Sequence, residues 1–367
     1  MSFAVAVGGA TGNVGQEMLR ILEQRDFPVA SLVPLASPAS ASSGRTVRFK
    51  GVEYPVRSLV DFDFSETDLL FLSTGATNSR ETSPRAASQG CFVIDNSSAF
   101  RMDPEVPLVV PEVNGEELDR PDRLHRRILP VANCSTIQLV VALKPLHDAA
   151  GIKRVVVDTY QAAAGGGRRL LDRLEHEANP RADSRCQLRE QSRMTLGAVG
   201  EKPIAFNAVP HIDVFLEDGR TKEEWKMEVE SRKILGIPDL QMAATCVRVP
   251  VFVGHSEAVH VEFERPLSVT DARQLLSMFP GISLIDENRL GGYATPLDCE
   301  GNDPVYVSRV RRDPSVPNGL SFWVVADNIR KGAALNAVQI AEVLVSRKTV
   351  TPRRCVWLRG RVVAAVR

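Results

Sequence analysis

Short apolar runs alternate with amphipathic stretches along the first third of the chain. Mostly apolar runs cover residues 3–7, 30–35, 68–72, 91–95 and 128–131, and each has the length of a buried strand. After the first run, Val14, Met18, Ile21 and Leu22 recur at the spacing of one helix face. Strands that alternate with helices predict an α/β domain with a parallel sheet of the Rossmann type, which binds dinucleotides.

From residue 152 onward the pattern favours strands. Residues 155–161 are β-rich, and Val259, Val261 and Phe263 alternate with polar residues as in a half-buried antiparallel strand. Further strands are expected at 247–255, 304–310 and 321–326, and helices at 221–235 and 333–345. Thr221 with Glu224 three residues later is a capping box that marks the start of the first of these helices. A second domain of the α+β class with a mixed sheet is therefore predicted.

Composition narrows the class of protein. The 367 residues are 44% hydrophobic, enough for two cores, and 45 basic side chains balance 45 acidic ones, so nothing indicates nucleic acid or an acidic membrane surface. Six cysteines are scattered without a C-x-x-C pair, which predicts no disulfide framework, no metal site and a reducing cytoplasm. No apolar run approaches the length of a membrane span, and no basic leader precedes the first strand, so a soluble, unprocessed protein is expected.

A glycine turn follows the first predicted strand. Gly9, Gly12 and Gly15 are spaced three residues apart and open the first predicted helix. Backbone without side chains can approach a pyrophosphate at a helix N-terminus, where unpaired N–H groups and the helix dipole favour anions. At the first strand-to-helix turn of the chain, this spacing predicts a dinucleotide site.

Two further turns are expected at the same edge of the sheet. Ser37 is at the end of the second strand, where NAD-specific folds have an acidic residue that binds the ribose. Because serine carries no negative charge, a 2′-phosphate would not be repelled, and NADP is favoured. Arg45 and Arg48 are the nearest cations, although both could simply belong to a surface hairpin. Ser73–Gly75 follows the strand at 68–72, and Arg101 follows the strand at 91–95; Arg101 is either a ligand of the crevice or an ordinary surface arginine.

Cys134 lies between a short strand at 128–131 and the apolar run 139–143, which ends at Pro145. This arrangement predicts a strand, a tight turn and a buried helix that begins at the cysteine. A helix N-terminus lowers the pKa of a thiol, which suits a nucleophile. The alternative is that Asn133, Ser135 and Thr136 compete as helix caps, with Cys134 a small buried filler.

Charged residues in the second half are the other candidates. Arg248 lies within an apolar run and needs an anionic partner, either a substrate carboxylate or a buried glutamate. His255 ends that run and is either a general base or a structural histidine. Glu230 and Lys233 share one helix face and are either ligands or an exposed ion pair. Three glycines at 165–167 predict a close approach of the backbone.

Taken together, these segments resemble the aspartate-semialdehyde dehydrogenase family. The resemblance extends from the glycine turn to about Val345, and its most specific segments are Asn133–Gln138, Tyr160–Gln161, Pro210–Asp213, Glu230 with Lys233, Arg248 with His255, and Asp327–Asn336. It implies NADPH-dependent reduction of aspartyl phosphate to aspartate semialdehyde and phosphate, through a cysteine thioester, in the biosynthesis of lysine, threonine, methionine and diaminopimelate. NADP is the implied cofactor, with NAD not excluded.

The resemblance also implies roles. Cys134 would attack the aldehyde, His255 would act as acid and base, and Gln161 would orient the intermediate. Arg248 and Glu230 would hold the substrate's carboxylate and amino group, while Arg101, Asn133 and Lys233 would bind phosphate. The implied cofactor residues are Gly9, Thr11, Gly12, Asn13, Val14, Gly15, Ser37, Ser73, Thr74, Gly75 and Asn328.

The implied organisation is an NADP-binding domain at 1–132, a catalytic and dimerisation domain at 133–331 and a basic tail at 348–367. A helix at about 332–347 would pack back on the first domain. A cytoplasmic homodimer without nucleic-acid or membrane partners is expected.

Three departures from the family pattern stand out. Val131–Ala132 replaces an Asn-Pro pair before the nucleophile, Ala164–Gly167 replaces Ser-Gly-Ala-Gly, and an Arg-Ser pair after Ser37 is absent. The rival enzyme is N-acetyl-γ-glutamyl-phosphate reductase, which the 133–138 segment and the Glu230 and Lys233 pair disfavour. A non-catalytic cofactor-binding homologue is the other rival, but such a protein would typically have lost its nucleophile or its base.

Overall fold

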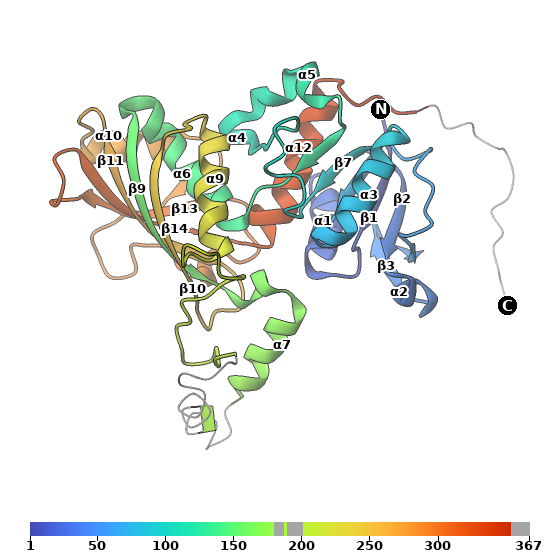
Figure 1. Ribbon diagram of the computed structural model, residues 1–367, viewed down its shortest axis with the longest axis horizontal. Helices are drawn as coiled ribbons and strands as arrows, with labels where there is room; N and C mark the ends of the chain where they lie inside the picture. Colours follow the sequence, from blue (N-terminus) through green and yellow to red (C-terminus); the bar gives the residue numbers. More distant parts are fainter. Residues whose placement is uncertain (180–186, 189–200, 354–367) are drawn as a thin grey trace, which may run out of the picture.

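A computed structural model describes residues 1–179, 187–188 and 201–353. Its helices and strands form two sheets with helices packed against them (Figure 1). The predicted α/β dinucleotide-binding domain and the second domain with a mixed sheet are both confirmed. The exact domain bounds at 132 and 331 stay a prediction, and residues 354–367 of the predicted tail lie outside the described residues.

The first sheet is parallel throughout and has the order β5-β2-β1-β6-β7-β8. Its strands are β1 (Phe3–Gly8), β2 (Val29–Ala36), β5 (Arg57–Ser58), β6 (Leu69–Leu72), β7 (Phe92–Asp95) and β8 (Ile128–Pro130). Alternate residues of β6 enter separate cores: Phe71 packs with residues of α1 (Asn13–Gln24), and Leu70 packs with Ala86 of α3 (Ala76–Ser88). Both faces are therefore covered, which explains why the strands read as continuous apolar runs.

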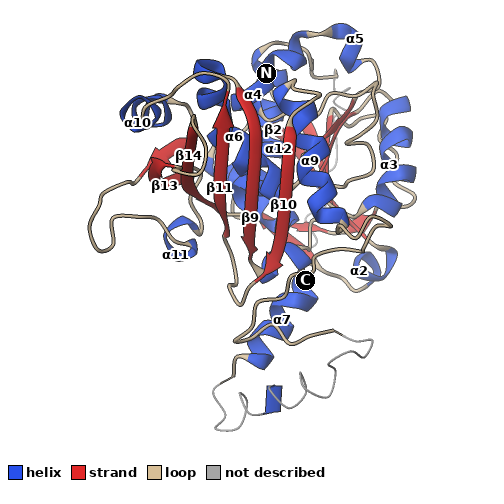
Figure 2. Cartoon of the chain, turned by 60° about the vertical axis from the view of Figure 1, so that its left-hand side comes forward, coloured by secondary structure: helices blue, strands red, loops and turns tan. Residues whose placement is uncertain are grey.

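The second sheet is mixed and has the order β10-β9-β11-β14-β13-β12. Its strands are β9 (Ile152–Gln161), β10 (Gln241–Arg248), β11 (His255–Phe263), β12 (Ile282–Leu284), β13 (Val305–Arg312) and β14 (Gly319–Ala326). Figure 2 shows α6 (Cys134–Ala150) behind β9 and β11, while the opposite face of these strands is turned to the viewer. The other helices packed near this sheet are α9 (Lys222–Leu235) and α10 (Val269–Met278).

Shorter elements connect these layers. They are α2 (Pro38–Ser42), the hairpin of β3 (Thr46–Phe49) and β4 (Val52–Pro55), α4 (Pro111–Asn114), η1 (Gly115–Asp119), α5 (Pro121–Leu124), η2 (Ala163–Gly166), α7 (Arg168–Glu177) and α11 (Pro296–Cys299). The last two elements of the described part are a π-helical turn, η3 (Arg330–Ala334), and helix α12 (Leu335–Ser346). Helix α12 lies beside α1 in the core of the first sheet, and Asn336 Nδ2 donates to the carbonyl of Val109 over 3.1 Å.

Two expectations about individual elements are wrong. Residues 247–255 are not one strand, because β10 ends at Arg248 and β11 begins at His255. Between them lie Pro250, which has no N–H for a ladder, and Gly254, whose φ of +97° suits glycine. Helix α6 also does not end at Pro145 but continues to Ala150, with the proline inside it.

Candidate active site

A cavity of about 470 Å³ lies where the carboxyl ends of strands from both sheets meet. The residues that line it follow or end β6, β7, β8, β9 and β10, begin α6, or belong to α9 and the segment after β14. From the predicted set, it is lined by Val14, Ser73, Gly75, Arg101, Asn133, Cys134, Gln161, Arg248 and Asn328. Residues that are more than a hundred positions apart in sequence therefore meet in one space.

Cys134 is the first residue of α6, as predicted, and it lines the cavity. Asn133 caps the helix, because its Oδ1 accepts a hydrogen bond from the Ser135 N–H over 2.9 Å. Burial and the nearby Glu223 carboxylate raise the pKa of the Cys134 thiol to about 11, although Arg101, Arg248 and the helix backbone oppose this rise. The expected lowering of the thiol pKa is thus wrong for the protein without ligands, because burial outweighs the helix terminus.

Gln161 and His255 are both buried beside the nucleophile's helix. Gln161 Nε2 donates to Ser135 Oγ over 2.6 Å and to Glu223 Oε1 over 3.2 Å. The Ala162 N–H donates to His255 Nδ1 over 3.0 Å, so a neutral ring carries its proton on Nε2, which has no partner among the described residues. Burial, followed by the charge of Arg248, lowers the pKa of His255 well below its usual range. The imidazole is therefore neutral, and its Nε2–H is free to donate a hydrogen bond to a ligand.

Arg101 and Arg248 bring positive charge to the cavity wall. Arg101 Nη1 donates to Glu230 Oε1 over 3.0 Å and Nη2 donates to the Asn96 carbonyl, while Nε has no partner within the described ranges. Arg248 ends β10 in register with Gln161 of β9, and its Nη1 donates to the Ala162 carbonyl. No carboxylate pairs with Arg248 in the described part of the chain, and burial lowers its pKa. Of the two predicted partners for Arg248, a ligand carboxylate is therefore favoured over a buried glutamate.

Glu230 and Lys233 do not line the cavity, which corrects the predicted substrate contacts. Glu230 Oε2 instead accepts from the backbone N–H of Asn133 over 2.6 Å, behind the cavity wall. Lys233 Nζ donates to the carbonyls of Arg101 and Asp103, each over 2.8 Å. Burial, followed by the charge of Arg123, lowers the pKa of Lys233 to about 8. Both side chains thus support the loop that carries Arg101.

A pair that was not predicted, Glu223 and Lys226, does line the cavity. Glu223 Oε1 accepts from Asn133 Nδ2 over 2.8 Å, and its Oε2 accepts from Lys226 Nζ over 3.1 Å. Lys226 Nζ also donates to Asp213 Oδ2 over 2.6 Å. Burial raises the pKa of Glu223, but Lys226 and Asn133 outweigh this and lower it. The signal was another Glu-x-x-Lys pair near the start of the same helix, with Glu223 between the two residues of the capping box.

The glycine turn and its neighbours fit a dinucleotide. Gly9 has a φ of +79°, and a Cβ on it would lie 2.3 Å from the Ser73 carbonyl oxygen; a Cβ on Gly15 would lie 2.2 Å from the Gly9 carbonyl oxygen. Gly12 caps α1 without a side chain, with Thr11 and Asn13 on either side. Near the same edge, the Thr74 hydroxyl and the Asn96 amide are buried and have no partner among the residues that the structure describes. Ser37, at the end of β2, caps α2.

The described residues contain no group of His, Cys, Asp or Glu side chains suited to hold a metal ion. Within the same described ranges, no helix is both long and apolar enough to cross a bilayer.

Comparison with known proteins gives consistent matches over nearly the whole chain. Residues 4–120 match the family model described as "Semialdehyde dehydrogenase, NAD binding domain", and residues 143–331 match "Semialdehyde dehydrogenase, dimerisation domain". Aspartate-semialdehyde dehydrogenase of Aquifex aeolicus is 50% identical over 346 residues, which are 94% of this chain and 98% of that protein. The Bacillus subtilis protein of the same name is 44% identical, over 93% of this chain and 96% of its own.

Comparison with solved structures agrees with these sequence matches. The crystal structure of aspartate semialdehyde dehydrogenase II from Vibrio cholerae is similar with a TM-score of 0.85 and 44% identity, covering 94% of this chain and 99% of that chain. The complex of that enzyme with ASA is equally similar, with a TM-score of 0.85 and 43% identity over the same shares. The Candida albicans enzyme with NADP has a TM-score of 0.71 and 25% identity, covering 95% of this chain and 100% of that chain.

Proposed function

The chain belongs to the aspartate-semialdehyde dehydrogenase family, and on that premise we propose that Cys134 is the nucleophile of its reaction. The enzyme interconverts aspartyl phosphate with aspartate semialdehyde and phosphate, using NADPH in the biosynthetic direction. One observation carries the assignment: Cys134 begins a helix in a cavity whose wall also holds Gln161, Arg101 and Arg248. Nucleophilic cysteines are found in such partly buried sites at helix N-termini.

In the oxidative direction, the Cys134 sulfur forms a bond to the aldehyde carbon, and the thiol proton is transferred to the new alkoxide oxygen, which gives a neutral hemithioacetal. Because Nδ1 of His255 accepts from the Ala162 N–H, the neutral ring carries its proton on Nε2, and this N–H can donate a hydrogen bond to the new hydroxyl oxygen. Bound NADP would supply the acceptor for the hydride that leaves the carbon attached to Cys134, and the hydroxyl proton would leave to solvent, which gives the thioester. A phosphate oxygen then attacks the resulting thioester, the carbon–sulfur bond breaks, and Cys134 leaves as a thiolate.

Charge at the cavity wall matches the substrate. We assign the Arg248 guanidinium, which has no carboxylate partner among the described residues, to the substrate's carboxylate, and Glu223 to its amino group. Lys226 and Arg101 supply the cations that a dianionic phosphate requires. Glu223 and Lys226 thus take the roles first expected for Glu230 and Lys233. Asn133 positions Glu223 and caps α6, because both ends of its amide are already bonded.

The cofactor assignment is NADP at the glycine turn. The turn leaves no room for side chains, and the buried Thr74 hydroxyl and Asn96 amide are unbonded polar groups that a ligand could satisfy. Ser37 at the end of β2 does not repel a 2′-phosphate. NAD stays a possible second coenzyme, since Ser37 is not a cation that would select the phosphate.

We also propose a homodimer through the second domain, in the cytoplasm. The description "dimerisation domain" for the family model over residues 143–331 supports the assembly. Four cysteines lie in the described residues and are all free, which suits a reducing compartment.

The test is reduction of NADP, and separately of NAD, by the purified protein with aspartate semialdehyde. Turnover that requires phosphate is expected, and faster turnover with NADP than with NAD would support Ser37 as the end of the cofactor site. Measurable NADP binding without turnover would contradict the assignment and favour a non-catalytic homologue. Turnover with N-acetylglutamate semialdehyde instead would favour the reductase rival.

A further inference from the structure

Residues 327–334, here called the linking segment, connect β14 to α12 and touch two catalytic candidates at once. Asn328 Oδ1 accepts from the Gly254 N–H over 2.9 Å, one residue before His255. A Cβ on Gly332 would lie 2.7 Å from Cys134 Cβ, so the backbone of the segment is packed directly against the nucleophile. Asn328, Ile329 and Gly332 also line the cavity. Any shift of this segment therefore reaches Cys134 and His255.

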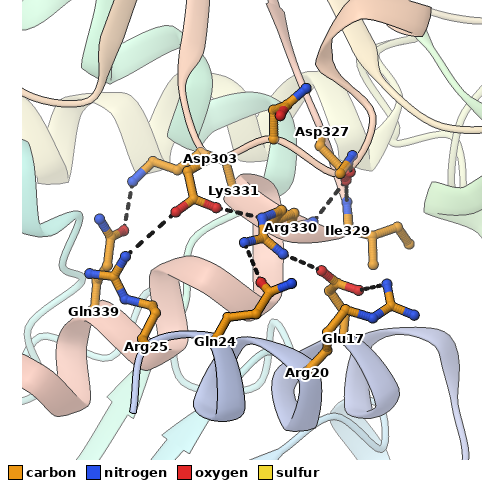
Figure 3. A network of polar contacts seen from close by, with 12 residues as sticks. Glu17, Arg20, Gln24, Arg25, Asp303, Asp327, Ile329, Arg330, Lys331 and Gln339 are labelled. Atoms are coloured by element: carbon orange, nitrogen blue, oxygen red, sulfur yellow. Dashed lines mark hydrogen bonds and ion pairs between the residues drawn. The ribbon is translucent and has the colours of Figure 1, made fainter. Parts of the chain in front are cut away.

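Arg330 fastens the linking segment to helix α1, which starts at the glycine turn (Figure 3). Its side chain is almost fully buried, and Nη1 donates to Glu17 Oε1 over 2.7 Å while Nη2 donates to Gln24 Oε1 over 2.8 Å. Its Nε donates to Asp303 Oδ1. One planar guanidinium thus bonds three side chains, two of which belong to α1, and a lysine could not reproduce this fork.

The remaining contacts keep the segment in one conformation. Asp327 Oδ1 accepts from the backbone N–H groups of Ile329 and Arg330, over 2.8 and 2.9 Å. Lys331 Nζ, also buried, donates to both carboxylate oxygens of Glu112, over 2.7 and 2.8 Å. Residues 330–334 form a π-helical turn, a rare conformation that often marks functional sites.

We propose that Arg330 is a positioning residue of the reaction: through the linking segment it holds Cys134 and the start of β11, with His255, against helix α1. The proposal rests on the assigned function of Cys134 and adds a residue that does not itself line the cavity. Misplacement of reacting groups by about 1 Å can lower a rate by roughly a hundredfold. Loosening the segment also lets water reach the thiol, whose pKa is raised by burial.

A merely structural role would lower stability and the amount of active protein without altering the chemistry of Cys134 in the molecules that remain folded. The test therefore compares Arg330→Lys and the milder Glu17→Gln with Arg25→Lys. Arg25 is a matched control, because it also joins α1 to a later part of the chain, bonding Glu342 Oε1 over 2.7 Å and Oε2 over 2.8 Å. It bonds none of residues 327–334, its contact with Asp303, which Arg330 also bonds, is a long one with Nη1 3.5 Å from Oδ2, and its side chain is about one-third exposed.

Three quantities are measured below the melting temperature of each variant. They are kcat, the KM values for NADP and substrate, and the rate at which iodoacetamide modifies the Cys134 peptide without cofactor. For Arg330→Lys we expect kcat to fall about 10- to 100-fold, both KM values to stay within about threefold, and alkylation at pH 8 to accelerate at least about threefold. Glu17→Gln should shift both rates in the same directions by less, and Arg25→Lys should leave both within about twofold.

The proposal is overturned if Arg330→Lys keeps kcat within about twofold, or if activity falls only with the folded fraction while alkylation is unchanged. If that variant does not fold, Glu17→Gln decides by the same criteria. Absence of turnover in the parent protein would refute the assigned function instead. The alkylation rates alone would then decide on Arg330, with faster modification relative to Arg25→Lys supporting it and equal rates contradicting it.

Discussion

Arg330 and Arg248 are both buried arginines, with relative exposures of 6% and 8%, but their surroundings differ. Arg330 bonds Glu17, Gln24 and Asp303, so each of its three guanidinium nitrogens has a partner. Arg248 donates to one backbone carbonyl and has no carboxylate partner among the described residues. Burying a charge without a partner costs free energy, whereas a fully bonded charge can hold elements together. The difference indicates which arginine serves the fold and which awaits a ligand.

The same contrast separates two sets of polar groups near Cys134. In the linking segment, Lys331 has both oxygens of Glu112 as partners. Among the residues that line or adjoin the cavity, several polar atoms are buried without partners in the described part of the chain: Thr74 Oγ1, both side-chain polar atoms of Asn96, Arg101 Nε and His255 Nε2. Unbonded polar groups around one cavity are typical of sites that bind a polar ligand.

The largest expected effect comes from removing the Cys134 thiol. Cys134→Ala should reduce turnover by at least about 10⁴-fold and abolish thioester formation, because no other side chain supplies the nucleophile. Phosphate-dependent NADP reduction and mass spectrometry of acylated protein measure both effects. Cys246→Ala, at a buried thiol away from the cavity lining, is the control and should keep turnover. Acylation that persists in the Cys134 variant would refute its role.

The substitution Arg248→Lys tests the comparison of Arg248 with Arg330 directly. A point charge cannot replace a bidentate fork, so the KM for aspartate semialdehyde should rise about 10- to 100-fold. The melting temperature should stay within about 2 °C, because no ion pair is lost. Arg154→Lys, at an exposed position of β9, is the control and should change neither value. An unchanged KM in Arg248→Lys, or a large loss of stability, would mean that Arg248 holds the fold and not the substrate.

The substitution Gly165→Ala adds a methyl group at the cavity and changes the charge of no residue. Its methyl group would lie 3.1 Å from His255 Nε2 and 3.3 Å from Arg248 Nη1. We expect kcat/KM to fall by about tenfold, as both groups are displaced by a few tenths of an ångström. Gly115→Ala, where a Cβ would meet nothing within 4 Å, should leave kcat/KM unchanged. Equal activity of the two variants would mean that the contact with His255 does not matter.

The smallest expected effect concerns Glu257, which is fully buried and whose carboxyl oxygens have no hydrogen-bond partner in the described residues. Burial raises its pKa well above 4.5, so above the unfolded pKa the folded protein keeps a proton that the unfolded chain releases. Stability is therefore lost as the pH rises. Glu257→Gln should raise the melting temperature by about 1–3 °C at pH 8 and leave it unchanged near pH 4.

Glu262→Gln is the control for that measurement, because Glu262 lies on the same strand and pairs with Lys153 near the surface. It should not raise the melting temperature at pH 8. A gain of equal size in both variants would show that the effect comes from general surface charge.

Much of the fold and part of the site were predictable from the sequence, because local patterns depend on local backbone geometry. Period-two and helical spacings identified both sheets, the glycine spacing identified the first turn, and the capping box at Thr221 and Glu224 placed the start of α9. The apolar run after Cys134 likewise predicted the helix that begins there. The break after Arg248 was missed, since apolar residues on both sides of Pro250 read as one strand.

Only the tertiary structure decided which charges face the cavity. The pairs Glu223 with Lys226 and Glu230 with Lys233 have the same spacing and lie about two turns apart, so both lie on the same face of α9. The two pairs differ in how close they lie to the cavity, and this depends on how the two sheets pack. Glu17 and Arg330 are 313 residues apart, and neither has a local signal for the other. The thiol pKa also depends on burial, which spacing along the chain does not encode.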